Sequence, residues 1–506
     1  MSATPTPTPR DFVSGVGVAL VLIPQAMAYA ELAGLPSQVG LFAAAVAPIA
    51  ATFFASSPYL QTGPSALTAL LTLGALVPLA ALGSTEYVRL AALLAVVVGI
   101  ARVLIGVLKT GWISYMMSRP MMDGFTSGAA ILIIGSQLPG LVGVQAPDGG
   151  VLGRAAWTLA NPGSWETAAL LMGLVTVGVI IGSRRIHPLV PGVLIATIMG
   201  WTFSVLTDYS GSTVGEVRAA LPVLDFRLPL SQLSLLILPG FVIALVGFAE
   251  AASISRFYAA RERMLWSPDR EFISQGVANL ASGLFGGLPV GASFSRSSLN
   301  YLSGARTRWS GAATGVTVLI FLPFAQVLSP LPRAILSAIV ISAVIPLIRL
   351  SLLISLWRMS RAQASVGWLT FGCTLWLSPH VEQAVVIGVF AAVAIHVWRE
   401  LRPGIESWTD TRGVHIRPAG VLWFGSAAIL EEMAAERLAR EPDAERLVIH
   451  LEGLGRIDLT GALALSEFIA GAKEGGFEVE LEGVPAHAER ILHGVLDWQP
   501  PQETER

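Results

Sequence analysis

Between residues 12 and 399 the chain consists of successive apolar stretches, most of them close to the ~20 residues that a helix needs to cross a membrane. Of its 506 residues, 53% are apolar and only 13% are charged, and the mean hydropathy is +0.66. A soluble globular chain does not normally reach these values. The sequence therefore predicts an all-α integral membrane region.

The apolar stretches predict fourteen transmembrane segments in two sets of seven. The first set is expected at residues 12–33, 37–55, 64–82, 87–108, 121–139, 166–183 and 188–207. The second set is expected at residues 234–256, 271–286, 293–304, 309–328, 333–350, 352–377 and 381–399. Residues 1–11 are predicted to be a disordered leader, and residues 208–233 a loop between the sets.

The arginines agree with this count. With the N-terminus in the cytoplasm, most arginines, including Arg102, fall on or near the cytoplasmic side. The arginines on the other side are Arg89, Arg154, Arg218, Arg227 and Arg333. This asymmetry follows the positive-inside rule, so we expect both termini in the cytoplasm.

From residue 400 onward the chain becomes charged, so residues 400–506 are predicted to form a cytoplasmic domain. Residues 447–451 and 477–481 have the pattern of strands, and residues 460–472 have the apolar spacing of a helix. A small α/β domain is expected, and it is too poor in candidate nucleophiles to predict an enzyme.

Composition excludes several kinds of site. The single cysteine, Cys373, lies in an apolar stretch, which rules out a disulfide framework and a cysteine metal cluster. The formal net charge of −2 gives no reason to expect a nucleic acid partner. We predict no metal site and no cofactor.

One segment, residues 283–300, interrupts the apolar pattern with glycines, a proline, four serines and Arg296. Lipid offers no hydrogen-bond partners, so such backbone persists at membrane depth only inside protein or beside a wet cavity. A helix that begins after the break presents unpaired N–H groups and a positive dipole end. With Arg296 one turn further on, the segment predicts an anion site.

A matching break occurs in the first set of segments, at residues 61–67. Gly63-Pro64-Ser65 in this break and Gly291-Ala292-Ser293 in the other both open an apolar stretch. Paired interruptions in the two halves of a hydrophobic chain indicate a transporter with inverted repeats and a binding site at the membrane midplane.

Several motifs occur in a characteristic order. They are PQAMAYA at 24–30, LAGLP at 32–36, GPS at 63–65, EAASISR at 250–256, AN at 278–279, SGLFGG at 282–287 and SFSR at 293–296. Together they resemble the SulP anion transporters, the sulfate permease group also called solute carrier family 26. The tail is similar to the STAS domain that these transporters carry, with IDLTG at residues 457–461 in its signature loop.

The resemblance implies two inverted seven-helix repeats, residues 12–207 and 234–399, split into a core and a gate domain and followed by the STAS domain at 400–506. It implies an anion held between the N-termini of the third and tenth segments and moved by an elevator-like shift. By motif position, the substrate-binding residues would be Gln25, Tyr29, Ser65, Ala66, Phe294, Ser295 and Arg296. A homodimer in the bacterial cytoplasmic membrane is also expected.

Glu250 is predicted to couple transport to protons, because a carboxylate at membrane depth is costly and by default marks a proton or ion path. Its alternative role is a structural partner of Arg296 or of a helix end. The other three residues also have alternative roles. Gln25 could hydrogen-bond a neighbouring helix, Tyr29 could pack in the core, and Arg296 could face the cytoplasm without touching substrate. The site serines are compatible with plain helix caps.

Thr460 occupies the position at which STAS proteins of the anti-sigma-factor antagonist type carry a phosphorylated residue. Phosphate at a helix N-terminus would be stabilised by the dipole, and a partner of the STAS domain is expected in the cytoplasm. The alternative is that Thr460 caps the turn that starts at Asp458.

These observations predict a secondary transporter of a small anion. The roomy, uncharged surroundings of Ala66 and Phe294, with Glu250 as a proton donor, favour proton-coupled symport of a dicarboxylate such as fumarate. Sulfate or bicarbonate transport or exchange, an uncoupled anion channel, and a membrane-anchored regulator that acts through its tail remain as alternatives. Sodium coupling is less favoured but stays open.

Overall fold

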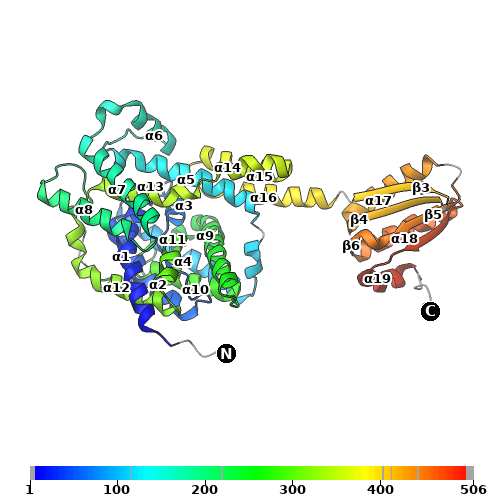
Figure 1. Ribbon diagram of the computed structural model, residues 1–506, viewed down its shortest axis with the longest axis horizontal. Helices are drawn as coiled ribbons and strands as arrows, with labels where there is room; N and C mark the ends of the chain where they lie inside the picture. The colour runs from blue at the N-terminus through cyan, green and yellow to red at the C-terminus, as the bar shows by residue number, and fades with distance from the viewer. Residues whose placement is uncertain are drawn as a thin grey trace. The chain divides into compact units, whose positions relative to one another are not determined.

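The computed structural model describes residues 6–115, 117–217, 220–401, 404–411, 413–441 and 444–496 (Figure 1). The chain divides into two compact units, Met1–Phe390 and Ala391–Arg506. The first unit is mostly helical, and the second contains a β-sheet with helices. This division follows the change of composition near residue 400.

The first half of the helical unit contains eight α-helices. They are α1 (Pro9–Leu32), α2 (Ser37–Phe54), α3 (Ala66–Leu76), α4 (Thr85–Val107), α5 (Arg119–Leu141), α6 (Val151–Ala160), α7 (Thr167–Ile186) and α8 (Gly192–Leu206). Its second half contains α9 (Leu233–Arg261), α10 (Pro268–Leu284), α11 (Phe294–Leu302), α12 (Trp309–Phe321), α13 (Arg333–Val344), α14 (Leu350–Met359), α15 (Arg361–Trp376) and the first half of α16 (Val381–Glu400), which continues into the second unit. Nine segments in the described part of the chain are long and apolar enough to cross a membrane.

Every predicted segment overlaps a helix, but the observed helices differ from the prediction in three ways. Residues 352–377 form two helices, because Ser360 is extended (φ −159°) and its side chain caps α15. Helix α3 ends at Leu76 and has only 11 residues. Helix α6 was not predicted, since it is too short to stand out as an apolar span.

Helix α1 begins inside the predicted leader. Thr8 and Asp11 form a capping box, so residues 9–11 are helical, whereas residues 1–5 lie outside the described residues. The Asp11 side chain is buried and accepts hydrogen bonds from the backbone N–H groups of Arg306 and Thr307, both at 2.7 Å. The start of α1 is thereby fixed to the loop between α11 and α12.

Replacing Asp11 with alanine is expected to lower the thermal stability of the purified protein. The change leaves the N–H groups of Arg306 and Thr307 without their acceptor, and the buried one, that of Thr307, costs about 1–3 kcal/mol. Thermal unfolding in detergent, followed by size-exclusion chromatography, measures the effect. Asp148→Ala, at an exposed loop position, is the control. Equal midpoints for the two variants would show that the Asp11 contacts contribute little.

The helices of this unit form two packing groups. In the first group, α10 packs against α2 and α4, α2 packs against α12, and α9 contacts α3 and α4. In the second group, α5 packs against α13 and α15, and α13 packs against α7. Helix α1 contacts members of both groups, including α2, α12 and α13.

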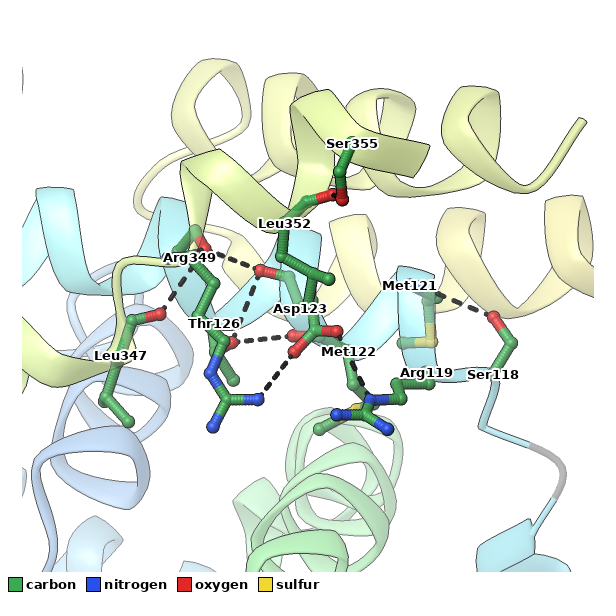
Figure 2. A network of polar contacts seen from close by, with 11 residues as sticks. Ser118, Arg119, Met121, Met122, Asp123, Thr126, Leu347, Arg349, Leu352 and Ser355 are labelled. Atoms are coloured by element: carbon green, nitrogen blue, oxygen red, sulfur yellow. Dashed lines mark hydrogen bonds and ion pairs between the residues drawn. The ribbon is translucent and has the colours of Figure 1, made fainter. Parts of the chain in front are cut away.

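A charged network fixes α5 to the start of α14 (Figure 2). Asp123 on α5 has an almost buried side chain, and its Oδ1 lies 3.1 Å from Nη1 of Arg349. Nε of Arg119 lies 3.9 Å from the other carboxylate oxygen. The backbone N–H of Arg349 also donates to the hydroxyl of Ser127, at 3.0 Å. Both arginines are largely exposed, so the buried carboxylate is the member that specifies this contact.

The C-terminal unit contains a mixed five-stranded sheet (Figure 1). Its strands are β3 (Gly404–Asp410), β4 (Gly413–Leu422), β5 (Arg446–His450), β6 (Leu454–Ile457) and β7 (Glu478–Glu482). The order is β3-β4-β5-β7, with β6 also paired to β4, and β3–β4 is antiparallel while the other pairs are parallel. Helices α17 (Phe424–Ala439), α18 (Leu459–Glu474) and α19 (Ala486–Leu496) contact the strands. The predicted strands and helix correspond to β5, β7 and α18.

Candidate anion site between two half-helices

The two chain breaks predicted from the sequence pair with each other. Strand β1 (Thr62–Gly63) lies antiparallel to β2 (Gly291–Ala292), with Thr62 opposite Ala292 and Gly63 opposite Gly291. Helix α3 follows β1 and helix α11 follows β2. Because the strands are antiparallel, the two N-termini lie at opposite ends of this short ladder.

Both helices begin with a serine cap. The hydroxyl of Ser65 accepts from the N–H of Thr68 at 3.4 Å, and that of Ser293 accepts from the N–H of Arg296 at 3.5 Å. Each cap satisfies one of the four N–H groups that a helix N-terminus leaves unpaired. The other first-turn N–H groups and the dipoles make both ends attractive to an anion.

Arg296 connects the two breaks. Its side chain is 1% exposed, and its Nη2 donates to the carbonyl oxygen of Pro64 at 2.9 Å. Its Nη1 donates to Oε1 of Gln25 on α1 at 3.3 Å. Its Nε has no hydrogen-bond partner among the described residues. A buried cation with one free donor therefore lies beside the ladder.

Glu250 and Tyr29 belong to the same cluster. Glu250, on α9, is half-buried, and its carboxylate accepts from the backbone N–H of Phe294 and interacts electrostatically with Arg296. Tyr29, on α1, is buried and interacts with the charges of Arg296 and Glu250. The contact with the first N–H of α11 is compatible with the alternative role of Glu250 as the partner of a helix end.

The remaining predicted residues lie at the two helix starts. Ser65 and Ala66 are buried at the start of α3. Phe294 is 47% exposed at the start of α11, with its ring centroid 5.8 Å from that of Phe257. Ser295 is exposed, and its hydroxyl lies 3.2 Å from that of Ser293. Residues from α1, α3, α9 and α11 thus gather around one ladder.

Thr460 lies in the other unit, on the first turn of α18, and it is exposed. The residue that caps α18 is Asp458, whose Oδ1 accepts from the N–H of Gly461 at 2.7 Å. The alternative prediction of Thr460 as the cap is therefore wrong, because the carboxylate two residues earlier takes that place. No group of three or more His, Cys, Asp or Glu side chains suited to a metal ion occurs among the described residues.

Sequence reasoning missed Arg102. The positive-inside count used it only as a residue on or near the cytoplasmic side, whereas its side chain is 0% exposed within α4. It donates to the carbonyl oxygens of Ala244 (3.0 Å), Ile243 (3.2 Å) and Val290 (3.0 Å). Sequence reasoning missed these contacts because backbone carbonyls, which leave no mark in a sequence, satisfy this guanidinium.

Asn279 was quoted only as part of a motif, yet it shapes the site. Its amide group donates to the carbonyl of Val290 at 3.1 Å, and its Oδ1 accepts from the N–H of Val290 at 2.9 Å. This two-way pairing fixes the residue that precedes β2. A polar amide within an apolar helix was the available signal.

A second buried carboxylate, Glu271 on α10, also escaped the sequence analysis. Its Oε2 accepts from the N–H of Ser57 (2.8 Å), the N–H of Ser56 (3.2 Å) and Nε1 of Trp266 (3.2 Å). These contacts fix the loop that leads from α2 to β1. Glu271 therefore fixes the segment before β1, whereas Asn279 fixes the residue before β2.

The sequence matches known transporters over most of its length. The sequence model described as the sulfate permease family matches residues 9–370. A probable sulfate transporter of Mycobacterium tuberculosis is 31% identical over 490 residues, which cover 90% of this chain and 86% of that protein. Among eight of its curated relatives, this chain spans between 66% and 93% of the relative's length.

Two solved structures have a similar fold. Murine solute carrier 26 family member A9, an anion transporter in the inward-facing state, gives a TM-score of 0.87 at 18% identity and covers 96% of this chain and 87% of that chain. The transmembrane domain of the cyanobacterium bicarbonate transporter BicA gives 0.65 at 26% identity, covering 76% of this chain and 97% of that chain. The resemblance predicted from the motifs is confirmed, and the chain is an integral membrane protein that belongs to the sulfate permease family.

Proposed function

We propose that this protein is a secondary active transporter that binds a small anion between the N-termini of α3 and α11, beside Arg296. The observation that carries the proposal is the buried guanidinium of Arg296, which retains a free Nε–H donor beside the ladder from which both helices start. Transport, without chemical conversion of the anion, is the activity that such a site in a membrane protein supports.

Sulfate is the proposed substrate, because the probable sulfate transporter of Mycobacterium tuberculosis is 31% identical over 90% of this chain. Bicarbonate is the second candidate, favoured by the fold and 26% identity shared with the bicarbonate transporter domain. The dicarboxylate expected from the sequence has no support among these relatives, and fumarate serves below as a competitor in the assay.

Proton coupling is proposed to act through Glu250. An ionised Glu250 accepts from the first N–H of α11 and offsets the charge of Arg296. Protonation would free that N–H and raise the positive charge facing the anion, so that anion and proton bind together. A carboxylate that only capped α11 would give no such dependence.

For the movement we propose an elevator-like shift between the two packing groups. The group containing α2, α4, α9, α10 and α12 would be the core domain, and the group containing α5, α7, α13 and α15 the gate domain. With α14 and α15 counted as one segment and α6 omitted, each proposed inverted repeat has seven segments.

The C-terminal unit is proposed to be a STAS domain that lies in the cytoplasm and binds a cytoplasmic partner, with Thr460 as a phosphorylation site. Its mixed sheet with helices is compatible with that assignment. A homodimer with both termini inside, in a bacterial cytoplasmic membrane, completes the proposal.

Uptake into proteoliposomes tests the function. We expect an inward proton gradient to drive accumulation of labelled sulfate above equilibrium, and Glu250→Gln to abolish that accumulation while exchange of sulfate persists. The glutamine retains the size of the side chain but cannot release a proton. Unlabelled bicarbonate and fumarate, added as competitors, rank the three substrates.

Glu86→Gln, an exposed position in the first turn of α4, is the control and should retain the gradient response. Equal flux with and without the gradient in the unmodified protein would contradict proton symport. Single-channel currents would identify an uncoupled channel instead.

A further inference from the structure

Arg102 is a buried cation whose three partners in the structure are all backbone carbonyl oxygens. Two of these carbonyls belong to α9, and the third belongs to Val290, directly before β2. Carbonyl dipoles solvate a guanidinium but do not cancel its charge. Such a charge is costly at membrane depth and is usually paired or functional.

The guanidinium lies directly behind the ladder. The carbonyl of Val290, which accepts from Nη1, belongs to the peptide that leads into Gly291 of β2. A Cβ placed on Gly247 would lie 2.5 Å from Nη2 of Arg102 and 3.3 Å from Cγ2 of Thr68. Thr68 is in the first turn of α3, and its N–H is the one capped by Ser65. One glycine therefore separates Arg102 from the first turn of α3.

We propose that Arg102 is the second fixed positive charge of the anion site and sets its preference for divalent over monovalent anions. This proposal rests on the proposed function. Arg102 would act through its field and through its hold on β2, without touching the anion. It is a positioning residue.

Charge counting supports the proposal. Arg296 and Arg102 contribute two positive charges at the ladder, Glu250 contributes one negative charge when ionised, and Tyr29 is neutral. With Glu250 ionised, the net charge of the site is +1, which matches a monovalent anion. With Glu250 protonated, the net charge is +2, which matches a divalent anion. Glu271 and Arg308, which lie near Thr62 of β1, carry opposite charges, so this pair adds no net charge when both are ionised.

The field and a merely structural role predict different results. Coulomb energy is proportional to the charge of the anion, so removing a fixed charge at roughly 10 Å should weaken binding of a monovalent anion roughly tenfold and of a divalent anion roughly 100-fold. A structural defect would weaken both by the same factor.

The test measures KM for labelled sulfate and the inhibition constant of nitrate in proteoliposomes, for the unmodified protein, Arg102→Gln and Arg102→Lys. In Arg102→Gln, we expect the factor by which sulfate binding weakens to be the square of the factor by which nitrate binding weakens. Arg102→Lys, which retains the charge but not the planar fork, should preserve the ratio of the two constants.

Equal losses for both anions in Arg102→Gln, or a changed ratio in Arg102→Lys, would overturn the proposal. If Arg102→Gln does not fold, Arg102→Met, which is also uncharged and unbranched, takes its place in the same comparison, and the expected loss for sulfate is again larger than that for nitrate. If the unmodified protein takes up no sulfate and nitrate does not compete, the proposed function has failed, which is distinct from a failure of the role of Arg102.

Discussion

Replacing Arg296 with glutamine is expected to reduce sulfate uptake at least roughly 100-fold, because a unit charge about 4 Å from an anion contributes ~4 kcal/mol at the effective dielectric of a protein. The change removes the cation beside the two helix N-termini and also the donors to Pro64 and Gln25. The measurement is initial-rate uptake into proteoliposomes at several sulfate concentrations.

Arg154→Gln is the matched control, since Arg154 lies exposed on α6. It should transport at the rate of the unmodified protein. Arg296→Lys should give an intermediate rate, because lysine retains the charge but cannot bond Pro64 and Gln25 in the same planar geometry. Normal uptake by a folded Arg296→Gln protein would exclude Arg296 from the anion site.

Replacing Gly40 with alanine is expected to cause the largest structural defect. A Cβ on Gly40 would lie 2.0 Å from the carbonyl oxygen of Ala26 and 2.7 Å from its carbonyl carbon. Both are backbone atoms, so α1 and α2 must move apart, with a cost of roughly 1–3 kcal/mol or more. Ala26 follows Gln25, so the same displacement should weaken the contact between Gln25 and Arg296.

We expect Gly40→Ala to lower both the thermal midpoint in detergent and the rate of anion uptake. Gly17→Ala, on the neighbouring helix α1, is the control, because nothing lies within 4 Å of a Cβ at Gly17. That change should leave the midpoint unchanged or slightly higher, since alanine favours helix more than glycine does. Similar midpoints for the two variants would contradict the tight α1–α2 contact.

The sequence predicted features whose physical cause is local. A long apolar stretch is helical in a membrane wherever it occurs, so every predicted segment overlaps a helix, although α6 was missed, α3 is shorter than predicted, and α14 and α15 were predicted as one. Ser65 and Ser293 cap the residues three positions on, and such caps are legible from the order of residues alone. The resemblance to the transporter family added the names of the site residues but not their contacts.

Local patterns also have limits within one segment. Residues 352–377 read as one apolar stretch, yet Ser360 ends one helix and caps the next. Hydropathy averages over a window, and a single extended residue leaves that average unchanged. The cap at Asp458, in place of Thr460, shows the same limit at a turn.

The tertiary structure decided what depends on residues far apart in the chain. The sequence determined by itself that two breaks exist and that each opens a helix, because glycine, proline and serine act on their own backbone. Only the packing of α1, α4, α9 and α10 around them pairs β1 with β2, brings Arg296 to Gln25 and Pro64, and buries Arg102 against three carbonyls. Every residue offers the same carbonyl group, so no sequence pattern marks the ones that a guanidinium will find.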